Sequence, residues 1–153
     1  MDVKHVNPFV ESFAAVMPQL GFGAVRKGRL NAKGQELICS GVVIIVGIVG
    51  AIKGNVVYSI ETEHAKKIAS TMMMGMPVVE LDDMSKSALS ELTNMLTANA
   101  ATSFSKIGVE IDISTPTLLY GKNISVKMSS AQVLSIELLA DEIPIDVNIA
   151  FEG

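Results

Sequence analysis

The stretch "LICSGVVIIVGIVGAI" at residues 37–52 contains no charged side chain and decides which folds this chain can form. It is shorter than the roughly 20 apolar residues that a membrane-spanning helix requires. Its β-branched residues and glycines favour buried strands instead, with turns or bulges at Gly47, at Gly50 and, just beyond the stretch, at Gly54. A second run of the same kind, "IKGNVVYSIE", follows at residues 52–61. We therefore expect neighbouring strands at the centre of a water-soluble domain.

The composition is that of one folded domain. The chain has 153 residues, of which 49% are hydrophobic and 18% charged, so it is long enough and apolar enough to bury a core. The net charge is −4, and no stretch concentrates Lys and Arg, which argues against nucleic acid as the main partner. The opening residues, "MDVKHVNPFVESF", lack the apolar segment of a signal peptide. We expect a single cytoplasmic domain over residues 1–153, not attached to a membrane.

The N-terminal residues predict a helix. Apolar side chains recur at helical spacing in residues 4–20, and Pro8 is tolerated only near a helix start, so the helix is expected to begin around Asn7. The polar stretch "KGRLNAKGQE" (27–36), which comes before the apolar runs, is typical of a turn region.

Two more helices are expected in the middle of the chain. The first is "TEHAKKIASTMMMGM" (62–76), with Thr62 as its N-cap and Gly75 as its stop. For the methionine-rich end of this segment, packing into the core is favoured over a pliable binding surface. The second, within residues 79–108, is the longest helix candidate and is acidic at its start, as the helix dipole prefers.

The order of elements predicts an α+β fold. After the long helix the chain again reads as strands, so each half of the sequence has an amphipathic helix, a polar turn and about three strands. Consecutive strands joined by short turns favour an antiparallel sheet with the helices packed against it. We therefore expect a mostly antiparallel sheet built from a pseudo-two-fold repeat of a helix plus three strands.

The long helix has two chemically different sides. At about 100° per residue, the side predicted to face the core collects Met84, Ala88, Leu89, Leu92, Met95, Leu96 and Ala100. The nearly opposite side collects Ser87, Glu91, Asn94, Ala98 and Ala101. Ala98 and Ala101 have short side chains, so another protein can approach this side of the helix closely. Thr93 is expected on the flank, where a docked partner would touch it.

Glu91 and Asn94 are three residues apart and can reach toward the same object. Solvent exposure alone also explains an acid and an amide on an outward face, and this alternative stays open. The pair supplies too few ligands for a metal. A carboxylate can pair with a partner's cation, and a carboxamide can hold a water through hydrogen bonds. The pair is therefore suited to assist hydrolysis of a group that another molecule carries.

Other reactive side chains give weaker signals. The single cysteine, Cys39, lies within an apolar run, where a small buried hydrophobe is favoured over a nucleophile. His5 and His64 have no ligand-type neighbours at metal-binding spacing, which favours surface histidines over a metal site. The glycines of "GIVGAIKG" (47–54) do not match a nucleotide-binding loop.

The segment "SALSELTNM" (87–95) resembles the Ser/Asp-x3-Glu-x2-Asn signature of the CheC/CheX/FliY family of chemotaxis phosphatases, and the match reads Ser87-x3-Glu91-x2-Asn94. "DISTPTLLYG" (112–121) is similar to the Pro-Thr segment that follows the signature helix in this family. Because only one copy of the signature is present, the chain resembles the CheX type best. Thr93 and Ala98 stand where the family usually has glycine.

The resemblance implies a phosphatase that removes the phosphoryl group from the aspartate of a phosphorylated CheY-type response regulator. Asn94 would orient the attacking water and Glu91 would pair with the partner's active-site lysine, while Ser87, Ala98 and Ala101 would contact the partner. No cofactor of the protein's own is implied, since Mg²⁺ is expected in the response regulator. The resemblance also implies a homodimer in which the sheets of the two subunits join. The alternative is a non-catalytic interaction module, similar to the middle domain of the flagellar switch protein FliM.

Overall fold

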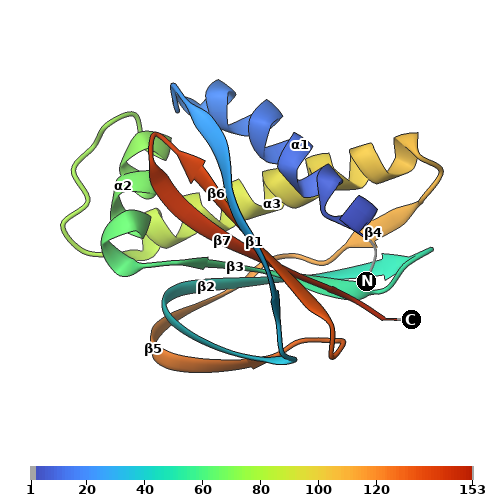
Figure 1. The fold of residues 1–153 in the computed structure, drawn as a ribbon. Helices are drawn as coiled ribbons and strands as arrows, with labels where there is room; N and C mark the ends of the chain where they lie inside the picture. Colours follow the sequence, from blue (N-terminus) through green and yellow to red (C-terminus); the bar gives the residue numbers. More distant parts are fainter. Residues whose placement is uncertain (1–2, 153) are drawn as a thin grey trace.

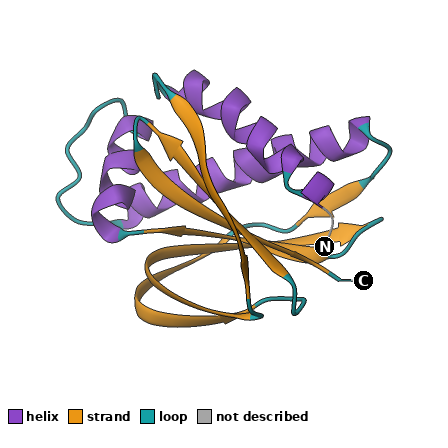
Figure 2. Ribbon diagram, viewed as in Figure 1, coloured by secondary structure: helices purple, strands orange, loops and turns teal. Residues whose placement is uncertain are grey.

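The computed structural model describes residues 3–152 and contains one seven-stranded sheet with helices on one of its faces (Figure 1). Figure 2 shows the same view with the helix layer and the strand layer in different colours. The helices are α1 (Asn7–Val16), α2 (Thr62–Met72) and α3 (Asp83–Lys106), with short 3-10 turns at Val3–His5 and Met17–Leu20. The strands are β1 (Val25–Lys33), β2 (Glu36–Gly50), β3 (Gly54–Ile60), β4 (Ile111–Ile113), β5 (Thr117–Lys127), β6 (Val133–Ala140) and β7 (Ile143–Phe151).

The sheet interleaves the two halves of the chain. Its order is β1-β6-β7-β3-β2, and both β4 and β5 pair with the remaining side of β2. Every pairing is antiparallel. β3 and β7 lie at the centre, and each half sends an outer strand to the other, because β1 pairs with β6 and β5 pairs with β2. The order is symmetric about the centre, and the predicted α+β class with a mostly antiparallel sheet is confirmed.

The main core lies between the helices and the sheet. It includes Phe9 and Phe13 from α1, Ile44 from β2, and Leu89 and Leu92 from α3, all buried. The opposite face of the sheet carries a smaller apolar cluster where β2 and β5 curl over (Figure 1), formed by Leu37, Val43, Val57, Val126, Met128, Val133 and Ala150. The apolar run at residues 37–52 therefore supplies both faces of one long strand, which explains why it contains no charge.

The predicted turn region at residues 27–36 is wrong, because most of it belongs to strand β1. β1 pairs only with β6, so it forms an edge of the sheet, and most of its residues are exposed. Edge strands commonly carry charges that discourage pairing with other chains, and this gives them the composition of a turn. A bulge between Lys27 and Leu30 interrupts the pairing further.

The first turn of α3 differs from the predicted pattern. Met84, expected in the core, is 61% exposed, whereas Ser85 is fully buried. Ser85 can be buried because its hydroxyl donates to the Asp82 carbonyl (3.0 Å), while its N–H donates to the Asp82 carboxylate (2.9 Å). This N-cap satisfies the polar groups at the helix start and turns Met84 toward solvent. Asp82 therefore fixes the rotation at which α3 begins.

The methionine-rich segment after α2 is also more exposed than predicted. Met74 is 96% exposed, and Met76 and Val79 are exposed as well, so core packing is wrong for this part of the segment. The predicted stop is confirmed, since Gly75 has a positive φ of 87° and its N–H donates to the Ser70 carbonyl at 2.8 Å. Thr62 is the first residue of α2 rather than its cap. No helix within residues 3–152 is both long enough and apolar enough to cross a bilayer.

Replacing Asp82 with alanine should destabilise the protein at neutral pH, and the effect should fade as the pH falls through the lowered folded-state pKa of Asp82. The hydrogen bond from the Ser85 N–H lowers the pKa of the Asp82 carboxyl below its usual value. A carboxylate of this kind stabilises the folded state above its unfolded-state pKa of about 3.9, and the contribution is lost as the pH falls through the lower folded-state pKa. Thermal unfolding at several pH values measures the effect. Asp83→Ala, which removes an exposed acid without this capping bond, is the control, and equal losses for both variants at pH 7 would contradict the prediction.

Candidate functional site

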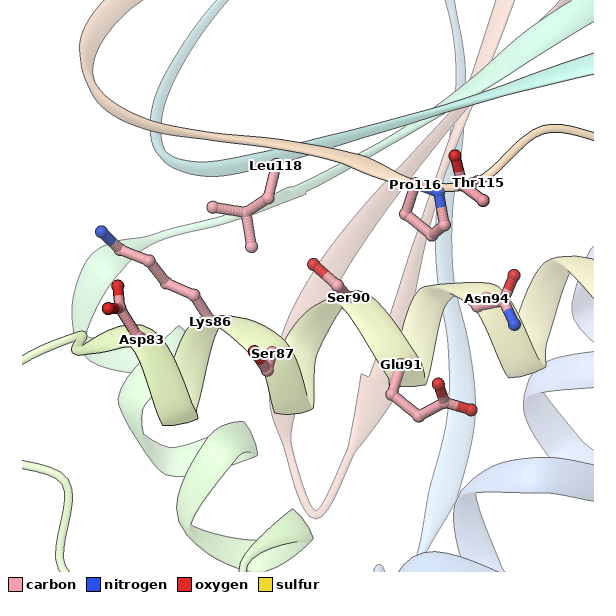
Figure 3. Close-up of a pocket in the computed structure, with 9 residues that line it drawn as sticks. All are labelled: Asp83, Lys86, Ser87, Ser90, Glu91, Asn94, Thr115, Pro116 and Leu118. Carbon is pink, nitrogen blue, oxygen red and sulfur yellow. The ribbon is translucent and has the colours of Figure 1, made fainter.

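An open pocket lies between the outward side of α3 and the segment that joins β4 to β5 (Figure 3). The residues that line it are Asp83, Lys86, Ser87, Ser90, Glu91 and Asn94 from α3, and Thr115, Pro116 and Leu118 from the opposite wall. The predicted pair and the first signature position thus lie in one pocket, and Figure 3 shows Ser87, Glu91 and Asn94 projecting from the same side of the helix.

Glu91 and Asn94 are available to a partner. Glu91 is exposed and Asn94 is half-buried. Within the described residues, neither side chain makes a hydrogen bond or an ion pair with the rest of the chain. A carboxylate and a carboxamide that face solvent without protein partners keep their full capacity to bind an incoming cation or water. Ala98 and Ala101 continue along the helix, exposed and half-buried, but they lie outside the pocket lining.

The wall of the pocket is fixed by a break in the edge of the sheet. β4 and β5 both pair with β2, and residues 114–116 interrupt them. At this break the Ser114 N–H donates to the Gly47 carbonyl (2.9 Å), and the Gly47 N–H donates to the Ser114 hydroxyl (2.8 Å). A Cβ at position 47 would lie 3.3 Å from that hydroxyl, so glycine suits this close approach. The contact holds Thr115 and Pro116 opposite the outward side of α3.

Beneath the pocket, α3 is tied to the sheet by a buried polar contact. The Thr97 hydroxyl donates to the Thr93 carbonyl (2.6 Å) and lies 2.9 Å from the hydroxyl of Tyr58 on β3. Burial raises the pKa of Tyr58 well above its ordinary value, so its hydroxyl stays protonated at neutral pH. This contact, together with the packing of Leu92 and Leu96, fixes the rotation of α3 and hence the direction of the outward side chains.

The expected position of Thr93 is wrong. Its side chain is 1% exposed, and its hydroxyl donates to the Ser90 carbonyl (3.0 Å), so it cannot touch a docked partner. Thr93 lies four residues after Leu89 and four before Thr97, which places it in the stripe that faces the sheet. The residue that replaces the family's usual glycine therefore lies under the helix rather than beside the pocket.

Several pocket residues were not singled out from the sequence. Lys86 and Ser90 lie on the same helix side as Ser87, so helical spacing alone could have identified them. Thr115, Pro116 and Leu118 are more than 20 positions away from Asn94 in the chain, and only the folded sheet brings them to α3. The Pro-Thr segment quoted for the family resemblance was the available signal for this wall.

The remaining candidates lie away from the pocket. His5 packs edge-on against Phe151, with ring centroids 5.2 Å apart, and His64 lies 3.8 Å from the carboxylate of Glu61. Cys39 is half-buried beside the smaller apolar cluster. Among residues 3–152, no group of three or more His, Cys, Asp or Glu side chains could hold a metal ion. That the protein needs no cofactor of its own stays a prediction.

Comparison with known proteins identifies the family. The family model for the chemotaxis phosphatase CheX matches residues 42–139. The chain belongs to the CheX family. The CheY-P phosphatase CheX of Thermotoga maritima is 32% identical over 128 residues, which cover 83% of this chain and 82% of the relative. The predicted family and the predicted enzyme class, a phosphatase, are confirmed.

Solved structures show the same fold. A CheC-like superfamily protein from Shewanella sp. PV-4 superposes with a TM-score of 0.87 at 28% identity, covering 100% of both chains. The CheX of Borrelia burgdorferi, in a CheX–CheY–BeF3–Mg²⁺ complex, gives a TM-score of 0.83 at 24% identity and covers 99% of this chain and 100% of its own. In this CheX family member, the pocket presents a carboxylate and a carboxamide on one helix, neither of them with a hydrogen-bonding partner among residues 3–152.

Proposed function

We propose that this protein hydrolyses the aspartyl phosphate of a CheY-type response regulator. The observation that carries the proposal is that Glu91 and Asn94, neither with a hydrogen-bonding partner in the described chain, lie in one pocket on the outward side of α3. The substrate is suggested by the relative from Thermotoga maritima, which is named a CheY-P phosphatase. The Borrelia burgdorferi CheX, which was solved together with CheY, supports the same choice of partner.

The reaction needs a positioned water more than it needs an acid or a base. An aspartyl phosphate is a mixed anhydride, so the aspartate carboxylate is already a good leaving group. The water oxygen forms a bond to phosphorus, the bond between phosphorus and the aspartate oxygen breaks, and the aspartate leaves as a carboxylate. The phosphate product takes up the protons of the water. The response regulator would supply Mg²⁺ and a lysine to offset the charge that develops on the phosphoryl oxygens.

Asn94 would hold this water in line with the phosphorus. Its carboxamide oxygen accepts a hydrogen bond from the water and leaves a lone pair of the water oxygen pointing at phosphorus. Orientation of this kind is worth several kcal/mol in favourable reactions, with about 7–11 kcal/mol as the upper range. The fixed rotation of α3 supports the role, because a water held on a mobile side chain would gain little. Pro116 lies on the opposite wall of the same pocket.

Glu91 would hold the two proteins in register. It lies one helical turn before Asn94 on the same side, so its carboxylate can pair with a lysine at the rim of the partner's phosphorylation site. Ser87 lies a further turn away and is exposed, where it can contact the partner's surface without taking part in the chemistry. The two signature residues would thus have different roles, Glu91 in docking and Asn94 in catalysis.

The direct test is catalysis of phosphoryl release. The protein is mixed at a small fraction of the substrate concentration with each phosphorylated receiver domain of its own genome, and the loss of the phosphoryl group is followed over time. At least one receiver should lose its phosphoryl group faster than it does alone. If none of the receivers is dephosphorylated faster, the proposed function is wrong.

Glu91→Ala should lower kcat/KM for the preferred receiver by at least about tenfold, mostly by raising KM, since it removes one partner of an interfacial charge pair. Steady-state kinetics and binding of the receiver measure both parts. Glu11→Ala, which removes an exposed carboxylate from α1 outside the pocket, is the matched control and should leave both parameters unchanged. A KM within twofold of the wild-type value would show that Glu91 does not dock the partner.

The second candidate is an interaction module without activity, like the FliM-type domain considered from the sequence. Such a module needs an exposed surface on α3 but has no use for a carboxamide without a partner beside a carboxylate. If an Asn94→Ala variant kept full function in the cell, this candidate would be favoured.

A homodimer joined through its sheets stays part of the proposal. Within residues 3–152, β1 and β5 each pair on one side only, so each leaves a strand edge open. Light scattering of the purified protein gives the oligomeric state directly, and a monomer at micromolar concentration would exclude it.

A further inference from the structure

The pocket is longer than the proposed chemistry needs. From Asp83 to Asn94 the helix rises about 16 Å at 1.5 Å per residue, whereas a phosphoryl group and its water occupy only a few ångströms. Glu91 and Asn94 lie toward one end of this length. Asp83, Lys86 and Leu118 lie toward the other (Figure 3), and nothing in the proposed reaction uses them. We call this second part the Lys86 end of the pocket.

Lys86 is a cation without a carboxylate partner among residues 3–152. Its side chain is half-buried, and its ammonium lies 5.4 Å from the ring centroid of Tyr120 on β5. By contrast, Lys66 lies 2.8 Å from the Glu63 carboxylate and Arg26 lies 2.7 Å from the Glu142 carboxylate. Within the described residues, Lys86 forms no such ion pair. The ammonium is therefore held in place by an aromatic ring and keeps its hydrogen-bond donors for another molecule.

The acids nearest in sequence do not neutralise Lys86 by direct contact. The Asp82 carboxylate accepts the Ser85 N–H as the helix cap and feels the charge of Lys86 only at a distance. Asp83 lines the same end of the pocket but does not form an ion pair with Lys86. In addition, Lys86 lies in the first turns of α3, where the helix dipole disfavours a cation. A residue that breaks a local preference without a compensating ion pair is a candidate for a role in binding.

We propose that Lys86 is a docking residue that binds an acidic side chain on the surface of the receiver domain, with the Tyr120 ring holding its ammonium in position. This inference rests on the proposed function. The phosphoryl group itself is not the ligand of Lys86, because Lys86 lies eight residues, or about 12 Å along the helix, from Asn94. Glu91 and Lys86 then offer opposite charges to the partner at two separate points of one groove. A receiver domain whose surface charge has the same sign as Glu91 or Lys86 at the matching point is disfavoured, so the two residues contribute to partner choice.

Lys86→Met tests this, because methionine keeps the length of the aliphatic stem and removes the charge. We expect KM for the preferred phosphorylated receiver to rise about tenfold and kcat to stay within twofold, with a weaker dependence of KM on salt. Lys86→Arg should restore most of the affinity. Tyr120→Phe keeps the ring and should be neutral, whereas Tyr120→Leu should raise KM severalfold. Lys106→Met, at the exposed far end of the same helix, is the matched control.

Binding of the receiver in its beryllofluoride-activated form, a non-hydrolysable stand-in for the phosphorylated state, separates this inference from the proposed function. If the wild-type protein binds that form without hydrolysing the phosphorylated one, the proposed activity is wrong. The affinity of the Lys86→Met variant for the beryllofluoride-activated receiver then still tests the docking role of Lys86. An affinity within twofold of wild type, or a loss confined to kcat, would overturn the role of Lys86. If the wild type neither binds nor hydrolyses any receiver, both ideas are wrong.

Discussion

Asn94→Ala should reduce kcat for dephosphorylation of the preferred receiver by at least about 100-fold, while the affinity for the receiver changes little. The carboxamide contributes only when the water is aligned with phosphorus, so its loss is expected to appear in kcat rather than in KM. Stopped-flow measurement of phosphoryl loss under saturating conditions, together with a binding titration of the beryllofluoride-activated receiver, separates the two quantities.

Two further variants show whether the chemistry of the side chain matters or only its shape. Asn94→Asp keeps the shape but loses the N–H donors and places a negative charge near the phosphoryl oxygens, so it should also be nearly inactive. Asn99→Ala makes the same change as Asn94→Ala on a half-buried asparagine of α3 that does not line the pocket, and it should retain full activity. Activity of Asn94→Ala within threefold of wild type would remove Asn94 from the mechanism.

Leu92→Ala should destabilise the fold by about 2–5 kcal/mol, because the substitution removes a large buried side chain and leaves a cavity. Leu92 lies between the two signature residues in the sequence, yet it is fully buried against the sheet. Denaturation in urea measures the loss, which should appear as a lower midpoint with an unchanged slope. Leu119→Ala makes the same change at a side chain that is 40% exposed and should cost about 0.5 kcal/mol or less.

The Leu92 prediction also tests the orientation of the helix on which the site depends. If α3 were rotated so that Leu92 faced solvent, Glu91 and Asn94 could not both reach a partner. A loss similar to that of Leu119→Ala would therefore contradict the burial of Leu92 and the placement of the pocket together.

The sequence was most informative where periodicity and burial agree. α1 begins at Asn7 as the position of Pro8 indicates, and the apolar run at residues 37–52 is a strand for most of its length. Glu91 and Asn94 reach the same side of α3 because the helix is regular and the two residues are three positions apart. For these elements a single local rule, such as the position of a proline or the spacing of residues along a helix, is enough to predict the structure.

Sequence reasoning failed where a tertiary contact overrides the local pattern. β1 was missed because a charged edge strand and a polar turn have the same composition. Thr93 was misplaced because a threonine can be buried when its hydroxyl bonds the helix's own carbonyl, and Met84 because the Asp82 cap sets the start of the helix. Local patterns could not predict the far wall of the pocket, since it depends on how a distant break in the sheet edge meets α3, and only the Pro-Thr segment of the family resemblance pointed to it.

The interleaving of the two halves has a consequence for synthesis on the ribosome. The N-terminal half supplies β1, but the neighbour of β1 is β6, and the central strand β3 needs β7, which spans Ile143–Phe151. The emerging polypeptide therefore cannot complete the sheet around its apolar β2 strand until β7 has been synthesised. Contacts between residues this far apart in the chain also slow folding. The sheet that supports α3 is thus complete only after β7 has been made.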